Sequence, residues 1–214
     1  MSRLEETAEG IHVSFEARTA ARDRALAQAR TLIRHCANAI RAIHREEVDS
    51  VNQHLDEAHK LARALRHELA GYPDLYYAGY TQDALKEYAE ANLVCALINS
   101  HPLPSPEDLD LEPSTYLQGL AEAVGELRRR CLDLLLKGRS NEAEPLLEAM
   151  DDIYGVLVTM DYPDAITGGL RRLTDVARGI IERTRGDLTL SLRQERLEGS
   201  LREMESHLDD ITHQ

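Results

Sequence analysis

Apolar residues recur at helical spacing along most of the chain, with polar residues between them. Apolar positions three and four residues apart share one face of an α-helix, so each such run predicts an amphipathic helix. The first run predicts a buried stripe of Ala25, Ala29, Leu32, Cys36, Ala39 and Ile43. Asp49 and Ser50 then offer a helix cap. The second stripe consists of Val51, Leu55, Ala58, Ala62, Leu65 and Leu69.

The third predicted helix differs in kind from the first two. It starts near Thr81, after an aromatic link that runs from Tyr72 to Tyr80. From Tyr88 to Ile98 the segment is apolar on all sides, apart from Glu90 and Asn92. A helix without a hydrated face lies in the protein interior. We therefore expect this segment to be the central helix of the fold.

A proline-rich loop from His101 to Pro113 follows, because proline cannot continue a helix. Ser114 is expected to cap a fourth helix, whose apolar stripe is Leu117, Leu120, Val124, Leu127, Cys131 and Leu134. A fifth helix is predicted from about Asn141 to Met160, and a last one from Pro163 or Asp164. Since no segment alternates as a strand would, the sequence predicts an all-α bundle of about six to seven helices, in a single domain of residues 1–214.

Several properties of the chain favour a cytoplasmic protein that is not bound to a membrane. No apolar run approaches the roughly 18–20 residues of a membrane-spanning helix. The start of the chain also lacks the basic and apolar stretches of a secretory signal. Cys36, Cys95 and Cys131 each lie in an apolar helical pattern, without the paired spacing of a zinc site. They are expected to be reduced thiols in the core.

The net charge of −13 argues against an outer surface that binds nucleic acid, so a polyanion would have to meet a local basic patch. Arginine residues form such groups in the first two helices and further along the chain. These are Arg18, Arg22, Arg24, Arg30, Arg34, Arg41, Arg45, Arg63, Arg66, Arg128, Arg129, Arg130, Arg171 and Arg172. They suit phosphate binding, but pairing with neighbouring carboxylates explains them equally well.

Four glutamates are the candidate chemical groups. Glu87 and Glu90 project from one side of the third helix, where burial is costly unless a cation or hydrogen-bond donors compensate. Glu122 and Glu126 face away from the apolar stripe of the fourth helix, and a solvated face would explain them. If that face instead met the third helix, four carboxylates would converge. Such an oxygen-rich cluster suits Mg²⁺ or Mn²⁺.

Two segments resemble motifs of the translin family. Residues 86–91 read Lys-Glu-Tyr-Ala-Glu-Ala, and catalytic subunits of that family carry Glu-Tyr-x-Glu-Ala on a central helix. Residues 116–131 are similar to the second motif, in which Tyr-Leu-x-Gly precedes an acidic residue and then Gly-Glu-Leu. The order of the segments and the proline-rich loop between them also agree, and the resemblance extends from roughly residue 10 to 190.

The resemblance implies a translin-like helical bundle that assembles into a closed, barrel-like homo-oligomer, commonly an octamer, with RNA held inside. The family's catalytic, metal-binding carboxylates align with Glu87, Glu90, Glu122 and Glu126, of which the third is typically aspartate in the eukaryotic nuclease subunit. The implied function is that of an endoribonuclease that uses Mg²⁺ or Mn²⁺ to cut single-stranded or partly unpaired RNA. Two alternatives remain open: a non-catalytic oligomer that binds RNA or single-stranded DNA, and a helical scaffold.

Overall fold

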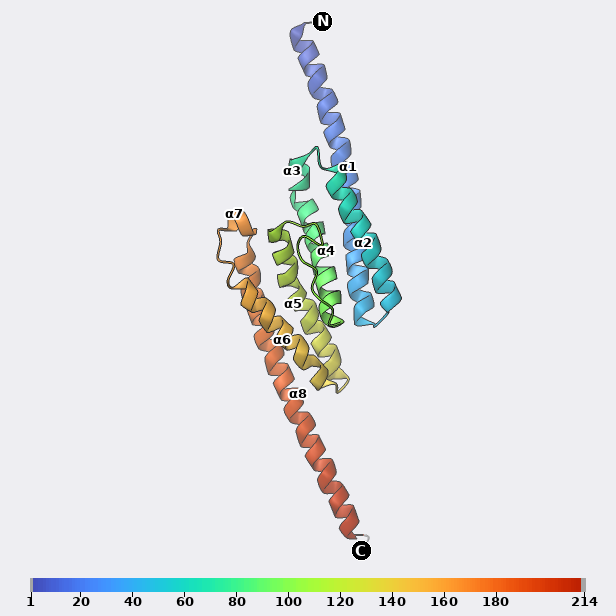
Figure 1. Cartoon of the computed structure of the whole chain (residues 1–214), viewed down its shortest axis with the longest axis vertical. Helices are drawn as coiled ribbons and strands as arrows, with labels where there is room; N and C mark the ends of the chain where they lie inside the picture. Colours follow the sequence, from blue (N-terminus) through green and yellow to red (C-terminus); the bar gives the residue numbers. More distant parts are fainter. Residues whose placement is uncertain (1, 213–214) are drawn as a thin grey trace. The chain divides into compact units, whose positions relative to one another are not determined.

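The computed structural model describes residues 2–212, with side chains described for residues 2–208, and this part of the chain is helical without any strand (Figure 1). The helices are α1 (Arg3–His44), α2 (Val48–Glu68), α3 (Pro73–Tyr76), α4 (Gly79–Ile98), α5 (Pro113–Leu136), α6 (Ser140–Leu157), α7 (Asp164–Thr167) and α8 (Leu170–Thr212). Since α3 and α7 are single turns, six long helices make up the described fold. The predicted all-α class is confirmed.

The chain forms two compact units, of which the first ends at Leu120 and the second begins at Ala121. Helix α5 continues without a break through this division. The prediction of a single domain stays a prediction.

In the first unit, α1 packs against α2 and α4, and α2 also packs against α4. All six residues of the predicted α1 stripe are buried, as are those of the α2 stripe except Leu55, which is half-buried. The expected burial of the third predicted helix is also confirmed, because Ala89, Leu93 and Val94 of α4 are fully buried. The apolar stripes were therefore sufficient to predict which helices form this core and which face each one buries.

Helix starts are less well predicted than helix faces. Helix α2 begins at Val48, with Glu47 rather than Asp49 or Ser50 at the N-cap. Helix α4 begins at Gly79 instead of Thr81, and the aromatic link before it contains the short α3. Helix α5 begins at Pro113, so Ser114 lies inside the helix and is not its cap. Proline is favourable at a first helical position because the backbone N–H it lacks has no partner within the helix there.

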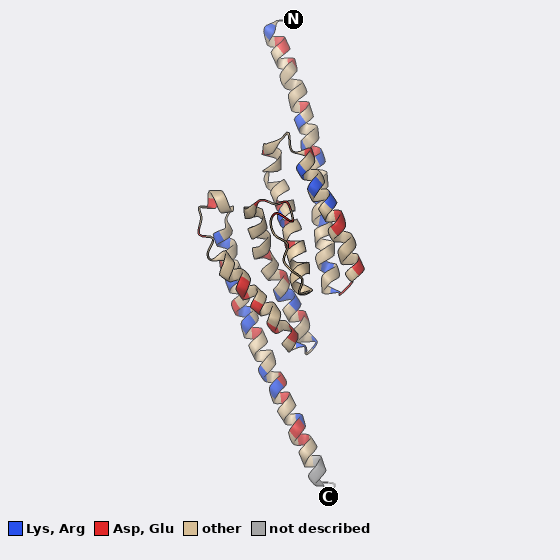
Figure 2. Cartoon of the chain, in the orientation of Figure 1, with Lys and Arg blue, Asp and Glu red and all other residues tan. Residues whose placement is uncertain are grey.

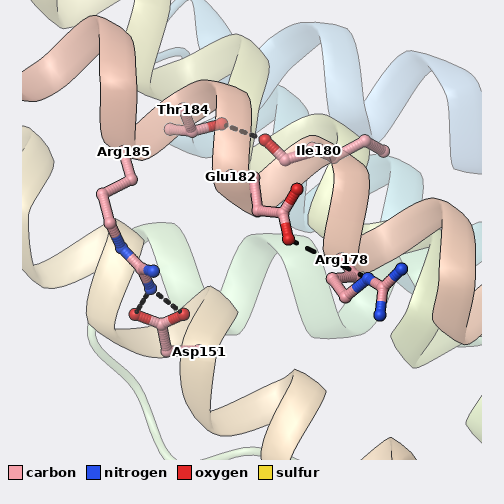
Figure 3. A network of polar contacts seen from close by, with 6 residues as sticks. All are labelled: Asp151, Arg178, Ile180, Glu182, Thr184 and Arg185. Atoms are coloured by element: carbon pink, nitrogen blue, oxygen red, sulfur yellow. Dashed lines mark hydrogen bonds and ion pairs between the residues drawn. The ribbon is translucent and has the colours of Figure 1, made fainter.

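In the second unit, α6 packs against α8. The last predicted helix is divided, because Gly168 and Gly169 adopt left-handed φ values of 62° and 85° between α7 and α8. Glycine tolerates this conformation because it has no Cβ atom. Figure 3 shows a polar link between the two long helices, in which Arg185 of α8 donates to both carboxylate oxygens of Asp151 of α6, at 2.6 and 2.7 Å. The chain therefore reverses direction between α6 and α8, and an ion pair joins these two antiparallel helices.

The three cysteines are buried free thiols, which confirms their expected place in the core. Among the described helices, none combines the length and apolar content that crossing a bilayer requires.

Candidate functional site

Helix α4 carries the first two candidate carboxylates and is held in place at its N-terminal end. The Thr81 hydroxyl donates to the backbone oxygen of Leu75 at 2.8 Å, and the Gln82 side chain donates to that of Tyr76 at 2.9 Å. Both bonds join α4 to the short α3. These two bonds fix the first turn of α4. Glu87 and Glu90 lie one to two turns further along the same helix.

Glu87 and Glu90 lie close together at the edge of this core. Glu90 is only 9% exposed, and the side chain of Glu87 is 31% exposed. A carboxylate oxygen of one residue lies within 4.8 Å of a carboxylate oxygen of the other. The Lys86 ammonium group lies 3.6 Å from Glu87 and offsets part of this negative charge. Two carboxylates so close to each other repel, and the buried one has lost solvation. A positive charge nearby therefore stabilises the pair.

The surroundings of the pair reflect its negative charge and its burial. Burial raises the pKa of the Cys36 thiol on α1, and the charges of Glu87 and Glu90 raise it further. Burial also raises the pKa of Tyr88 to about 12, and its hydroxyl lies 2.8 Å from Nδ1 of His59 on α2. The Cys36 thiol and the Tyr88 phenol therefore stay neutral beside the two glutamates.

Gly119 sets how closely the start of α5 approaches α4. A Cβ atom at this position would lie 2.6 Å from the Ala89 Cβ, 2.8 Å from the Lys86 backbone oxygen and 2.9 Å from the Glu90 backbone nitrogen. Since real Cβ atoms do not approach backbone atoms so closely, the contact requires glycine. One turn earlier, the Thr115 hydroxyl donates to the Gln82 side chain at 2.6 Å. The start of α5 therefore packs directly against the segment of α4 that carries Glu87 and Glu90.

Glu122 and Glu126 follow on the same helix and are both half-buried. They lie three and seven residues after Gly119, so they project from the same side of α5 as Gly119 does. The Glu126 carboxylate lies 3.5 Å from Arg129. The prediction that all four glutamates form one site stays a prediction. Gly119 was missed as a positioning residue, although a glycine inside a helix is a signal of close packing.

Several of the candidate arginines pair with carboxylates. Arg66 lies 2.8 Å from Asp110, and Arg128 lies 2.9 Å from Asp187. Arg18 pairs with Asp74, and Arg171 with Asp161. Figure 2 shows basic and acidic residues interspersed along the long helices. The alternative interpretation, pairing with nearby carboxylates, is therefore confirmed for these four arginines.

Known proteins resemble the chain over most of its length, although no family model matches it. The protein MJ0175 of Methanocaldococcus jannaschii is 31% identical over 186 residues, which are 86% of this chain and 82% of that protein. A solved complex of AfC3PO with duplex RNA has 34% identity and a TM-score of 0.82, covering 88% of this chain and 97% of that one. The structure of apo-NeC3PO, at 22% identity and a TM-score of 0.79 over 89% and 98% of the two chains, supports the fold alone.

Proposed function

The chain belongs to the translin family, as AfC3PO and NeC3PO do, and we propose that it is a metal-dependent endoribonuclease. Its substrate would be single-stranded or partly unpaired RNA held inside an oligomeric shell. One observation carries the proposal: Gly119 packs the start of α5 onto the segment of α4 that bears Glu87 and Glu90. Glu122 and Glu126 project from that same side of α5, so the four carboxylates would form one site.

The residues fit Mg²⁺ or Mn²⁺. All four proposed ligands are carboxylates, and these ions prefer oxygen ligands. Glu87 lies close to the buried Glu90, so a bound cation would stabilise the two carboxylates by offsetting their negative charge. When bound, such an ion lowers the pKa of a coordinated water molecule and offsets the charge that develops on the attacked phosphate.

The chain itself would hold and orient the ligands. Leu93 and Val94, one turn after Glu90, are fully buried, which anchors this part of α4 in the core. The contact between Tyr88 and His59 ties α4 to α2, which restricts rotation of the helix that bears the ligands. Rigid elements of this kind keep catalytic groups in a productive geometry without reorganisation during the reaction.

Binding of RNA is supported by the similarity to AfC3PO, whose structure was solved with duplex RNA. We propose a homo-oligomer, with an octamer favoured by the family resemblance, in the cytoplasm. If RNA binds on the inside of such a shell, the net charge of −13 can be carried mainly by the outer surface. Arginines that face inward would then position the RNA backbone without reading its sequence.

The test compares Glu90→Gln with Asp83→Asn, which changes an exposed carboxylate one turn before Glu87 on the same helix. Labelled single-stranded and duplex RNA is incubated with Mg²⁺, Mn²⁺ or EDTA. We expect the wild type and Asp83→Asn to cleave single-stranded RNA only with metal, and Glu90→Gln to lose at least 100-fold in rate, as is typical when a group that stabilises the transition state is removed. Undiminished metal-dependent cleavage by a folded Glu90→Gln variant would show that the site is wrongly assigned.

The second candidate function is non-catalytic binding of RNA or single-stranded DNA, which the AfC3PO structure also favours because it is a complex with duplex RNA. A pure binder would leave RNA intact under every metal condition but retain it in a gel-shift assay. Its affinity would fall steeply with salt, since phosphate contacts release counterions. The same samples used for the cleavage test distinguish the two functions.

A further inference from the structure

Two histidines meet at the edge of the contact between α1 and α2, which pack side by side in the first unit (Figure 1). Nδ1 of His35 on α1 lies 3.1 Å from Nδ1 of His54 on α2, and both residues are half-buried. The four candidate glutamates lie on other helices, α4 and α5. The histidine pair is therefore a second group of side chains that can bind a metal, built from different elements of the fold.

The packing of α1 against α2 fixes the backbone from which each histidine projects. Cys36, directly after His35, is fully buried. Val51 and Ala58 lie one turn before and one turn after His54, and both are buried. Side chains that project from packed helices are positioned more precisely than side chains on loops. The two imidazole rings are therefore brought together by the core beneath them.

The distance between the two Nδ1 atoms is close to that between two ligands of one metal ion. Two Zn–N bonds of about 2.0–2.1 Å that enclose a tetrahedral angle place their nitrogens roughly 3.3 Å apart. The two ring planes are inclined to each other by 63°, with 5.2 Å between their centroids. Since the lone pair of an imidazole nitrogen lies in the plane of its ring, inclined rings can direct both lone pairs to one point, whereas stacked parallel rings cannot. The orientation of the rings therefore fits a shared ion.

Glu57 supplies a carboxylate beside the two histidines. It lies three residues after His54 on α2, and residues at this spacing share one side of a helix. Burial and, secondly, His54 lower the pKa of His35, and the charge of Glu57 opposes this shift. The carboxylate is therefore near enough to interact electrostatically with the His35 ring. Two imidazoles and one carboxylate are a donor set of zinc sites in which water occupies the fourth position.

Lys60 is the present partner of this carboxylate. Its ammonium group donates to Glu57 at 2.7 Å, and the side chains of Lys60 and Glu57 are 69% and 44% exposed. An exposed ion pair contributes little to stability, because water solvates both partners well. Glu57 can therefore exchange Lys60 for a metal ion at a small cost in free energy. The same argument makes Lys60 a competitor of the metal for this ligand.

The donor set selects a different class of ion from the four glutamates. Imidazole nitrogen suits Zn²⁺, whereas Mg²⁺ and Mn²⁺ prefer oxygen. A histidine binds a metal in its neutral form, which the pKa of His35, lowered by burial, favours. The cysteine thiols are buried, and burial raises the pKa of each of them. They are therefore poor competitors for zinc in the folded chain.

From these observations we propose that His35, His54 and Glu57 form a zinc site that joins α1 to α2. The ion would take the place of the proton between the two Nδ1 atoms, and the ring that carried this proton would adopt its other neutral tautomer, protonated at Nε2. Because the ion would bind only where both helices are packed, it would stabilise the fold. The proposal goes beyond the proposed nuclease function, since its ligands, its helices and its ion are all different.

The test is isothermal titration of the metal-free full chain with Zn²⁺. It compares the wild type with His35→Gln, His54→Gln and Glu57→Gln, and His67→Gln is the matched control because it changes an exposed histidine of α2. Any zinc that the glutamates of α4 and α5 bind is common to all of these proteins. We expect the three ligand variants to weaken one zinc site at least about tenfold, since removing a group that only supports a metal ligand already costs this much. His67→Gln should bind as the wild type does.

Each result of this titration has a defined meaning, provided that circular dichroism shows the variants to be folded. Equal zinc affinity of the wild type, His35→Gln and His54→Gln would overturn the proposal, as would the absence of zinc binding by the wild type. Loss of affinity in both histidine variants but not in Glu57→Gln would overturn the assignment of Glu57 as a ligand. Nuclease activity is not a readout here, so failure of this proposal is distinguishable from failure of the proposed function.

A second measurement tests the competition between Lys60 and the metal. Lys60→Gln releases Glu57 from its ion pair, whereas Arg63→Gln removes a positive charge from an exposed residue of the same helix without touching that pair. We expect Lys60→Gln to tighten zinc binding by about two- to fivefold more than Arg63→Gln does, which corresponds to the free energy of an exposed ion pair. A gain that a merely structural role of Lys60 would not produce is the expected result. Weaker zinc binding by a folded Lys60→Gln variant would contradict the role of Glu57.

Discussion

The middle of α4 and the C-terminal half of α8 are both rich in apolar residues, but they have opposite surroundings. Leu93 of α4 is fully buried, whereas Leu197 of α8 is 60% exposed. Apolar residues occur on nearly all sides of α4, whereas those of α8 after Leu192 lie in one narrow stripe. The comparison shows that the distribution of apolar residues around a helix indicates its environment better than their number does.

The carboxylates of the two regions differ in the same way. Glu90 is buried in α4, beside Glu87, and Glu198 of α8 is an exposed residue that pairs with Arg202 on its own helix. An exposed ion pair contributes little to stability, because water solvates both partners well. A buried carboxylate has lost that solvation and must be compensated locally. Glu90 is therefore the stronger candidate for a chemical role.

The largest expected effect is on the free energy of unfolding, in which substitutions of Leu93 and Leu197 should differ strongly. Leu93→Ala removes a side chain from a filled core and should lower the free energy of unfolding by about 2–5 kcal/mol. Leu197→Ala should change it by no more than about 0.5 kcal/mol, because this side chain is largely in water. Urea denaturation followed by circular dichroism, at a protein concentration low enough to limit association, measures both. If both variants lost the same free energy of unfolding, the exposed region of α8 would be part of the folded core.

A smaller effect is expected where α5 approaches α4. Gly119→Ala forces a methyl group against Ala89 and the α4 backbone, so the free energy of unfolding should fall by about 1–3 kcal/mol. Gly125→Ala is the matched control on the same helix, because a methyl group there meets open space. It should raise stability by up to about 1 kcal/mol through higher helix propensity.

Thermal unfolding and RNA cleavage of the two glycine variants check this expectation. If Gly119 positions the carboxylates, Gly119→Ala should also lose cleavage activity at temperatures where it is still folded. A Gly119→Ala protein as stable and active as Gly125→Ala would mean that the approach of α5 to α4 has no bearing on the site.

The smallest expected effect is on the way in which the stability of the fold depends on pH. Nδ1 of His35 on α1 lies 3.1 Å from Nδ1 of His54 on α2, and the pKa of His35 is lowered by burial and, secondly, by His54. The native state thus prefers neutral His35, while the unfolded chain takes up a proton near pH 6.5. This contribution to stability is complete above pH 6.5 and is lost as the pH falls below it.

Urea denaturation between pH 7.5 and pH 5.5 measures this dependence. We expect His35→Gln to reduce the loss of stability on acidification, and His67→Gln, which changes an exposed histidine of α2, to leave it as in the wild type. If the His35→Gln and wild-type curves were parallel, the histidine pair would not be the titrating element.

Much of the first unit was predictable from local patterns. The stripes of α1 and α2, the burial of α4 and the proline-rich loop follow from helical periodicity and from the backbone restrictions of proline. The special status of Glu90 was also visible, because it interrupts a segment that is otherwise apolar. The exact starts of α2, α4 and α5 were not predictable from the sequence, since several neighbouring residues can begin a helix at similar cost in free energy.

The sequence by itself determined the all-helical class, the faces that the helices bury and the acidic motifs shared with the translin family, because each of these depends on residues close together in the chain. The tertiary structure decided that Gly119 lies against Lys86 and Ala89, and that the glycine pair at 168–169 separates two helices. It also showed that Leu190, Leu197 and Leu201 of α8 are exposed. The reason is physical: periodicity shows which face of a helix avoids water, but only packing between distant segments decides what covers that face.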